Sequence, residues 1–111
     1  MRVITHKVKR RASYDRGESN GYLVIDDKTH PWFGKEFDEI DIEVHGGLTF
    51  SREVTEELIS LYKELTSEDI GSWIIGFDTA HLYDTYDQWP DKEVRIHAEL
   101  YLLKPALELS K

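Results

Sequence analysis

Two-residue alternation of apolar and polar side chains is the clearest pattern in this sequence, and it is typical of strands with one buried face. The alternation is most regular at residues 39–45, where Ile40, Ile42 and Val44 alternate with acidic residues. Compact β-branched and aromatic runs elsewhere are typical of buried strands. Together these patterns predict strands at residues 3–8, 21–25, 39–45, 48–50 and 72–78.

Glycines mark two special positions in these strands. Gly46 and Gly47 separate two predicted strands, and a glycine pair favours a hairpin turn because both residues can take positive φ. Gly76 lies inside the strand predicted at residues 72–78, which indicates a close approach by another backbone or a ligand.

A helical spacing of apolar residues predicts two helices. The first covers residues 52–65, with Ser51 as its N-cap and one apolar stripe that would pack on a sheet. The tail from residue 91 fits both the strand and the helix period. Pro90 and the acidic residues after it favour a helix, with a kink or an end near Pro105.

The order of these elements predicts an α+β fold. We expect one small domain over residues 1–111, in which an antiparallel sheet of about four to five strands packs against two helices on one face. Within it, residues 1–16 form a basic N-terminal strand or arm, residues 20–87 a core that carries the motifs, and residues 91–111 the C-terminal helix.

The charge is unevenly distributed. The chain of 111 residues has a net charge of -8, but residues 1–16 carry +5 and the remainder carries -13. The total disfavours a general binder of duplex DNA, which needs a basic footprint. The basic arm either meets an anionic ligand or is a solvated first strand that neutralises the body.

Composition excludes further classes. There is no cysteine, so disulfides, thiolate zinc sites and a cysteine nucleophile are excluded. No apolar run approaches the roughly 20 residues of a membrane span, and the N-terminus lacks the apolar core of a secretory signal. We therefore expect a cytoplasmic protein without membrane contact. A homodimer is left open.

Two motifs stand out beyond composition. The segment Asp41–Ser51 reads DIEVHGGLTFS, and residues 73–81 read WIIGFDTAH, after a Gly21-Tyr22 pair and the run His30–Lys35. Together they resemble an uncharacterised family of small phage and prophage proteins, over roughly residues 20–87. The resemblance implies a phage origin, hence the host cytoplasm, and a shared site, without naming a reaction. Tyr83 departs from the pattern, because the family often has glycine there.

The motif residues suggest one site. His45 ends the acidic strand face beside the glycine turn, while Asp78 and His81 leave the end of another predicted strand, with Asp84 following. If the strands are neighbours, these side chains could share a pocket that holds Zn, Mn or Fe, and a hydrolase could use the ion to activate water. The alternative is structural: Asp78 and His81 cap the loop and His45 bonds a neighbouring backbone.

Aromatic and basic residues support a second hypothesis, the binding of a nucleotide. Aromatic rings in polar loops stack on bases, glycine amides can approach a phosphate, and arginines supply positive charge. The candidate ligand-binding residues are His45, Gly46, Gly47, Asp78, His81, Trp32, Tyr83, Arg10 and Arg11.

Acidic residues support a third hypothesis. Glu39, Asp41 and Glu43 would form a negative face that docks on a basic groove of a host protein and imitates nucleic acid. More often such a face is only solvated.

Because no complete catalytic set is visible, the sequence favours binding over catalysis. The leading hypothesis is a phage accessory protein that counters host defence by sequestering a nucleotide-derived signal. An acidic inhibitor of a host nucleic-acid or defence enzyme is the first alternative, and a metal-dependent hydrolase is the second. The cofactor expectation is limited to a divalent metal.

Overall fold

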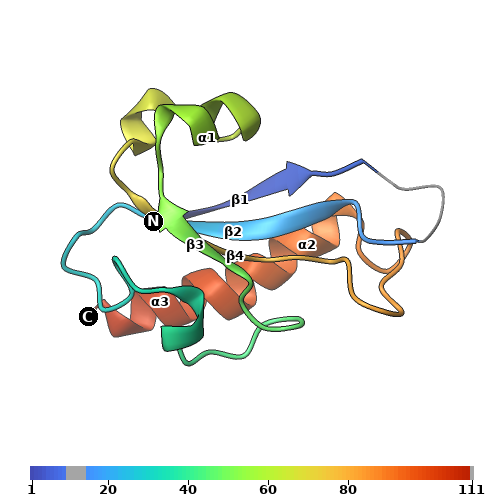
Figure 1. Ribbon diagram of the computed structural model, residues 1–111. Coiled ribbons are helices and arrows are strands. Elements are labelled where there is room, and N and C mark those ends of the chain that lie inside the picture. The colour runs from blue at the N-terminus through green and yellow to red at the C-terminus, as the bar shows by residue number, and fades with distance from the viewer. Residues whose placement is uncertain (10–14, 111) are drawn as a thin grey trace.

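The computed structural model describes residues 1–9 and 15–110 and confirms the α+β class. Its centre is one antiparallel sheet of four strands in the order β1-β2-β4-β3 (Figure 1). The two long-range pairings, β2 with β4 and β4 with β3, make β4 a central strand. The strands are β1 (Arg2–Lys7), β2 (Ser19–Ile25), β3 (Phe50–Glu53) and β4 (Trp73–Phe77).

Helices cover both faces of this sheet, so the prediction that one face carries them all was wrong (Figure 1). The reason lies in β2, where Leu23 and Ile25 face one side and Tyr22 and Val24 face the other, all of them buried. A strand that is apolar on both faces needs a cover on each. The helices are α1 (Glu56–Leu61), α2 (Asp91–Ala98) and α3 (Lys104–Leu109), with 3-10 turns at Phe37–Glu39 and Ser67–Asp69.

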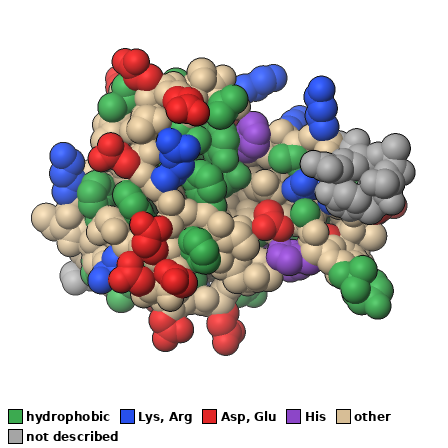
Figure 2. All heavy atoms as spheres, in the orientation of Figure 1, with side chains coloured by type: hydrophobic (Ala, Val, Ile, Leu, Met, Phe, Trp, Pro, Cys, Tyr) green, Lys and Arg blue, Asp and Glu red, His purple; other side chains and the backbone are tan. Residues whose placement is uncertain are grey.

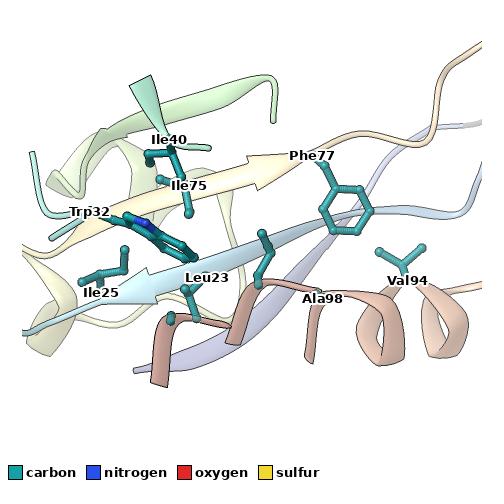
Figure 3. Close-up of a cluster of buried hydrophobic side chains, with 10 residues drawn as sticks. Leu23, Ile25, Trp32, Ile40, Ile75, Phe77, Val94 and Ala98 are labelled. Carbon is teal, nitrogen blue, oxygen red and sulfur yellow. The ribbon is translucent and has the colours of Figure 1, made fainter. Parts of the chain in front are cut away.

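The larger core lies between the sheet and the C-terminal helices (Figure 3). Leu23, Ile75 and Phe77 of the sheet pack against Val94 and Ala98 of α2. Phe77 belongs fully to this core, with 1% of its surface exposed. The C-terminal helices therefore cover the sheet face that carries the larger core.

The smaller core lies under α1 on the opposite face. It joins Ile4 and Tyr22 of the sheet to Leu58 of α1 and to Tyr62 after it. The hydroxyl groups of Tyr22 and Tyr62 are 3.1 Å apart in this core. A β-carbon on Gly76 would come within 2.8 Å of the Gly21 carbonyl oxygen, the predicted backbone approach, and within 2.2 Å of the Tyr22 ring.

The regular alternation at residues 39–45 is not a paired strand, which corrects the prediction. The segment follows a 3-10 turn and runs along the core, with Ile40 buried and Ile42 and Val44 partly buried against it. The alternating apolar side chains do face the core, although this segment pairs with no strand. Gly46 and Gly47 have the predicted positive φ, 69° and 81°, but their turn does not join two paired strands, so the predicted hairpin was wrong.

The strand before α1 and the helix itself are displaced from their predicted positions. Residues 51–53 pair with β4 as part of β3, instead of beginning a helix. The helix N-cap is Thr55, whose hydroxyl accepts a hydrogen bond from the Leu58 amide, and not Ser51. The helix ends at Leu61, four residues before the predicted end.

The C-terminal segment is helical, as predicted, and it passes through Pro105 without ending there. A π-helical segment, Glu99–Leu103, joins α2 to α3 directly before this proline. Proline has no amide hydrogen and its ring crowds the carbonyl four residues earlier, so a wider turn at this place relieves the conflict. No helix in residues 1–9 and 15–110 is long and apolar enough to cross a membrane.

Candidate metal centre

Antiparallel pairing of β3 with β4 brings the two motifs together. Phe50 pairs with Gly76, and the Thr49 amide donates to the Gly76 carbonyl at 2.9 Å. Residues that precede β3 must therefore lie beside residues that follow β4. His45 and His81 stand at these two places, and their ring centroids are 5.1 Å apart in an edge-to-face arrangement. The structure therefore places the two imidazoles side by side.

Asp84 is the centre of this cluster. His45 Nε2 lies 2.9 Å from Asp84 Oδ1 and 3.0 Å from Oδ2, and His81 Nδ1 lies 2.9 Å from Oδ2. The His81 backbone amide donates to the same Oδ2 at 2.9 Å. The carboxylate is buried, with 6% of its residue surface exposed, while both imidazoles are partly exposed.

Burial raises the pKa of Asp84, but the hydrogen bonds with His45 and with the amide and ring of His81 lower it more. The net pKa lies below the usual aspartate value, so the carboxyl is ionised at neutral pH. One ligand atom from each of His45, His81 and Asp84 lies within 4.8 Å of the others. An ionised carboxylate between two imidazoles is a donor set that divalent transition metals accept.

Asp78 contacts the far side of the His81 ring. Its Oδ1 lies 3.6 Å from His81 Nε2, while the other ring nitrogen faces Asp84. The same Oδ1 accepts a hydrogen bond from the Ala80 amide at 3.0 Å, so Asp78 also caps the start of the loop. His81 is therefore held between two carboxylates.

Rings from the loop after β4 and from the C-terminal helices support His45. Trp89 lies with its centroid 4.3 Å from the His45 ring. The His45 backbone amide donates to His97 Nε2 at 2.9 Å, and His97 stacks on Tyr101 at 4.4 Å. Burial and the charge of His45 lower the pKa of His97, which favours the neutral ring that this acceptor role requires.

Gly46 gives the His81 ring its space. A β-carbon on Gly46 would lie 2.2 Å from two atoms of that imidazole. Gly47 has open space at the corresponding position, and its amide donates to the Val44 carbonyl at 2.8 Å. The first glycine thus belongs to the site, and the second serves the turn.

The other predicted site residues are spread over the molecule. Trp32 packs in the larger core with 6% of its surface exposed, so it takes no part in the site (Figure 3). Tyr83 is 85% exposed and has φ of 75°, a conformation that favours glycine. Arg10 and Arg11 lie outside the described residues.

The acidic face is partly as predicted. Glu39, Asp41 and Glu43 are exposed along the segment whose apolar residues pack on the core. Figure 2 shows acidic side chains gathered on the lower left of the surface, where this segment lies. The backbone that presents them is a 3-10 turn and an irregular segment, and not the sheet strand that was predicted.

Sequence reasoning missed His97 as a member of the site. Its signal is weak: it precedes Tyr101 by four residues on a helix, a spacing that brings two rings together. Nothing in that spacing links the helix to His45, since the contact depends on how the helix packs on the sheet.

A shallow hollow of about 400 Å³ adjoins the cluster. It is lined by Asp15 and by residues 80–85, including His81 and Asp84. Leu82 and Tyr83 stand exposed beside it, at 83% and 85%. A small molecule could therefore reach the imidazole and carboxylate groups from solvent.

Comparison of the chain with models of protein families, with curated proteins and with solved structures gives no match. Inference about function therefore depends on the site itself.

Proposed function

We propose that this protein binds one divalent transition-metal ion through His45, His81 and Asp84 and uses it to hydrolyse a substrate. The observation that carries the proposal is the convergence of three ligand atoms within 4.8 Å of one another. Hydrolysis supported by a metal was one of the alternatives that the sequence left open, and the geometry favours it over the others.

The spacing of the ligand atoms suits an ion such as zinc. Around a tetrahedral zinc, ligand atoms about 2.0–2.1 Å from the metal are roughly 3.3 Å apart. In the structure both His–Asp distances are 2.9 Å. Small outward shifts of the three side chains would therefore accommodate the ion.

Asp78 supplies a second, independent argument. Histidines that ligate a metal usually donate their other ring N–H to a carboxylate or carbonyl, which fixes the ring and its tautomer. The His81 ring lies between two carboxylates in a similar way: Nδ1 faces Asp84, and Nε2 is 3.6 Å from Asp78 Oδ1, longer than a hydrogen bond. His97 acts differently on His45, because it accepts the backbone amide and not the ring N–H.

Three protein ligands leave a coordination position for water or substrate, as in catalytic zinc sites. A metal ion in such a site supplies a nucleophile at neutral pH by lowering the pKa of water. The chain contributes the ligand set and the hollow beside it, and Asp78 would hold the His81 ring from the side that faces away from the ion.

The sequestering of a nucleotide-derived signal, the acidic inhibitor and the phage origin stay predictions. For nucleotide binding, the exposed Tyr83 beside the site is favourable, but the Gly47 amide is already bonded within its turn. For the inhibitor, the exposure of Glu39, Asp41 and Glu43 is favourable and is also what a solvated face would show.

Metal binding is tested by titrating protein stripped of metal with Zn²⁺ and Co²⁺, using calorimetry and the visible absorption of tetrahedral cobalt. We expect one equivalent to bind, and Asp84→Asn and His81→Ala to weaken binding by at least about tenfold. Matched controls are Asp87→Asn, an exposed carboxylate of the same loop, and His6→Ala, a histidine that stacks on Tyr62 in the smaller core.

Circular dichroism would establish that each variant is folded. The absence of a stoichiometric site at neutral pH, or equal affinity in Asp84→Asn and Asp87→Asn, would contradict the metal site. If metal binds, hydrolysis of p-nitrophenyl esters that is lost on chelation and restored by the ion would support the catalytic part. Hydrolysis that persists under chelation would contradict it.

A further inference from the structure

The segment before β2 runs alongside the loop that carries the site. The Gly17 amide donates to the Thr79 carbonyl at 2.9 Å, and the Tyr86 amide donates to the Asp15 carboxylate at 3.1 Å. A β-carbon on Gly17 would meet the Thr79 side chain at 2.1 Å, so the two segments are in close contact. This places Arg16 beside the residues that connect Asp78 to His81.

In the part of the chain that the structure describes, Arg16 is anchored by an amide side chain and by no carboxylate. Its Nη2 donates to Asn20 Oδ1 at 3.0 Å, and the same oxygen lies 3.3 Å from the Thr79 amide. Its Nε is buried and has no hydrogen-bond partner among the described residues. Within residues 1–9 and 15–110, Arg16 forms no ion pair, whereas Arg2 and Arg95 bind Asp69 and Glu64. A buried donor on a charged group without an acceptor is costly, so its presence needs an explanation.

The negative charge around the hollow limits what Arg16 could bind there. Asp15 and Asp84 line the hollow, Asp78 lies on the far side of the His81 ring, and the whole chain is acidic. Figure 2 shows acidic, histidine and basic side chains close together on this part of the surface. An anionic ligand would be repelled by these carboxylates unless a metal ion and the arginine together offset them.

We infer that the site acts on a phosphate ester, with Arg16 binding oxygens of the phosphoryl group. This inference rests on the proposed metal site. The planar guanidinium presents a fork of donors that matches phosphate oxygens. A phosphate monoester has three non-bridging oxygens, so one can contact the metal ion while two accept from the guanidinium fork. A carboxylate has only two oxygens.

The reaction that follows is the hydrolysis of a phosphate ester. The oxygen of water forms a new bond to phosphorus, and the bond from phosphorus to the ester oxygen breaks. One proton of the water goes to solvent, and the leaving oxygen takes up a proton from solvent to become an alcohol. The products are the alcohol and inorganic phosphate. Tyr83 and Leu82, both exposed beside the hollow, would contact the leaving group.

The test uses inorganic phosphate as the probe and the zinc-loaded protein, with phosphate binding measured by calorimetry. We expect Arg16→Gln to weaken phosphate binding by at least about tenfold, since hydrogen bonds to charged groups are strong. Zinc affinity should stay unchanged. Arg52→Gln is the matched control, because Arg52 lies on β3, at the opposite edge of the sheet from β1, and bonds only Glu53 and Thr55 in the described contacts.

The outcomes separate the two proposals. Equal phosphate affinity in Arg16→Gln and in the wild type, with zinc bound in both, would overturn the role of Arg16 and leave the metal site standing. Phosphate that binds equally well without zinc would overturn the coupling between the ion and the anion. Failure of zinc to bind the wild type would remove both proposals.

A second variant tests the inference even if Arg16→Gln does not fold. Arg16→Lys keeps the positive charge and loses the fork of donors, so we expect phosphate affinity between those of the wild type and Arg16→Gln. Wild-type affinity in Arg16→Lys would show that the guanidinium geometry is not used and would overturn the inference.

Discussion

Gly46 lies against the imidazole of His81, so closely that a β-carbon on the glycine would come within 2.2 Å of ring atoms Cε1 and Nε2. We therefore expect Gly46→Ala to displace His81 and to weaken metal binding by at least about tenfold, an effect similar to the loss of a supporting residue. Calorimetric titration with Zn²⁺ measures the change.

Gly47→Ala is its matched control. Gly47 has a similar positive φ, 81° against 69°, but no heavy atom outside its own neighbours lies within 4 Å of the position of its β-carbon. The alanine would cost about 1–2 kcal/mol of backbone strain and leave His81 in place. Equal zinc affinity in the two variants would contradict the role given to Gly46.

His97 holds His45 through its backbone, since Nε2 accepts the His45 amide at 2.9 Å. His97→Phe keeps a ring against Phe77 and Tyr101 but leaves that amide without its acceptor. We expect it to lower zinc affinity by about tenfold. His97→Gln restores an acceptor and should recover much of the affinity.

Urea unfolding of both His97 variants separates a positioning effect from a loss of stability. If His97→Phe binds zinc as tightly as the wild type, His97 supports the core and not the site. If His97→Phe and His97→Gln lose affinity equally, the acceptor atom is not what matters.

The sequence suggests that His45 and His81 lie together if a strand over residues 39–45 neighbours the strand over residues 72–78. Residues 39–45 form no strand, and the pairing of β3 with β4 is what brings the two rings together. Asp84 was a candidate ligand, but its position as the central acceptor depends on the fold of the loop after β4. His97 comes from a helix, and only tertiary packing brings it to His45.

The wrong predictions for residues 39–45 and for the start of α1 also depend on tertiary packing. Ile40 and Val44 are spaced as in a strand because the core lies on one side of them, and such spacing contains no information on hydrogen-bond partners. Ser51 and Thr55 are both acceptable N-caps by residue type. The choice of Thr55 follows from the pairing of residues 51–53 with β4, a long-range interaction.

Tyr83 has φ of 75° although it is a bulky residue, so its backbone is strained. Tyr83→Gly should relieve this strain and raise the free energy of unfolding by about 1 kcal/mol. Thermal or urea unfolding measures the change. Leu82→Gly is the control: Leu82 is equally exposed and has no positive φ, so it should lower stability instead. A lower stability in both variants would contradict the strain at Tyr83.

The ion pair between Arg2 and Asp69 makes stability depend on pH. The Arg2 guanidinium, at 2.6 and 2.7 Å, lowers the pKa of Asp69; burial opposes this shift, and the Thr66 amide, which also donates to the carboxylate, adds to it. The folded pKa thus lies below the unfolded value of about 3.9. The resulting stability is present above that value and is lost as the pH falls through the folded pKa.

Asp69→Asn should therefore lower the free energy of unfolding at neutral pH by about 1–2 kcal/mol, an amount kept small because Arg2 is 45% exposed. Urea unfolding at a series of pH values should show the difference from the wild type shrinking below about pH 4. Glu68→Gln, which changes an exposed neighbouring carboxylate, should produce no such change. A difference between Asp69→Asn and the wild type that stays constant from pH 7 to pH 3 would show that the carboxylate stabilises the fold through its shape and hydrogen bonds, independently of its charge.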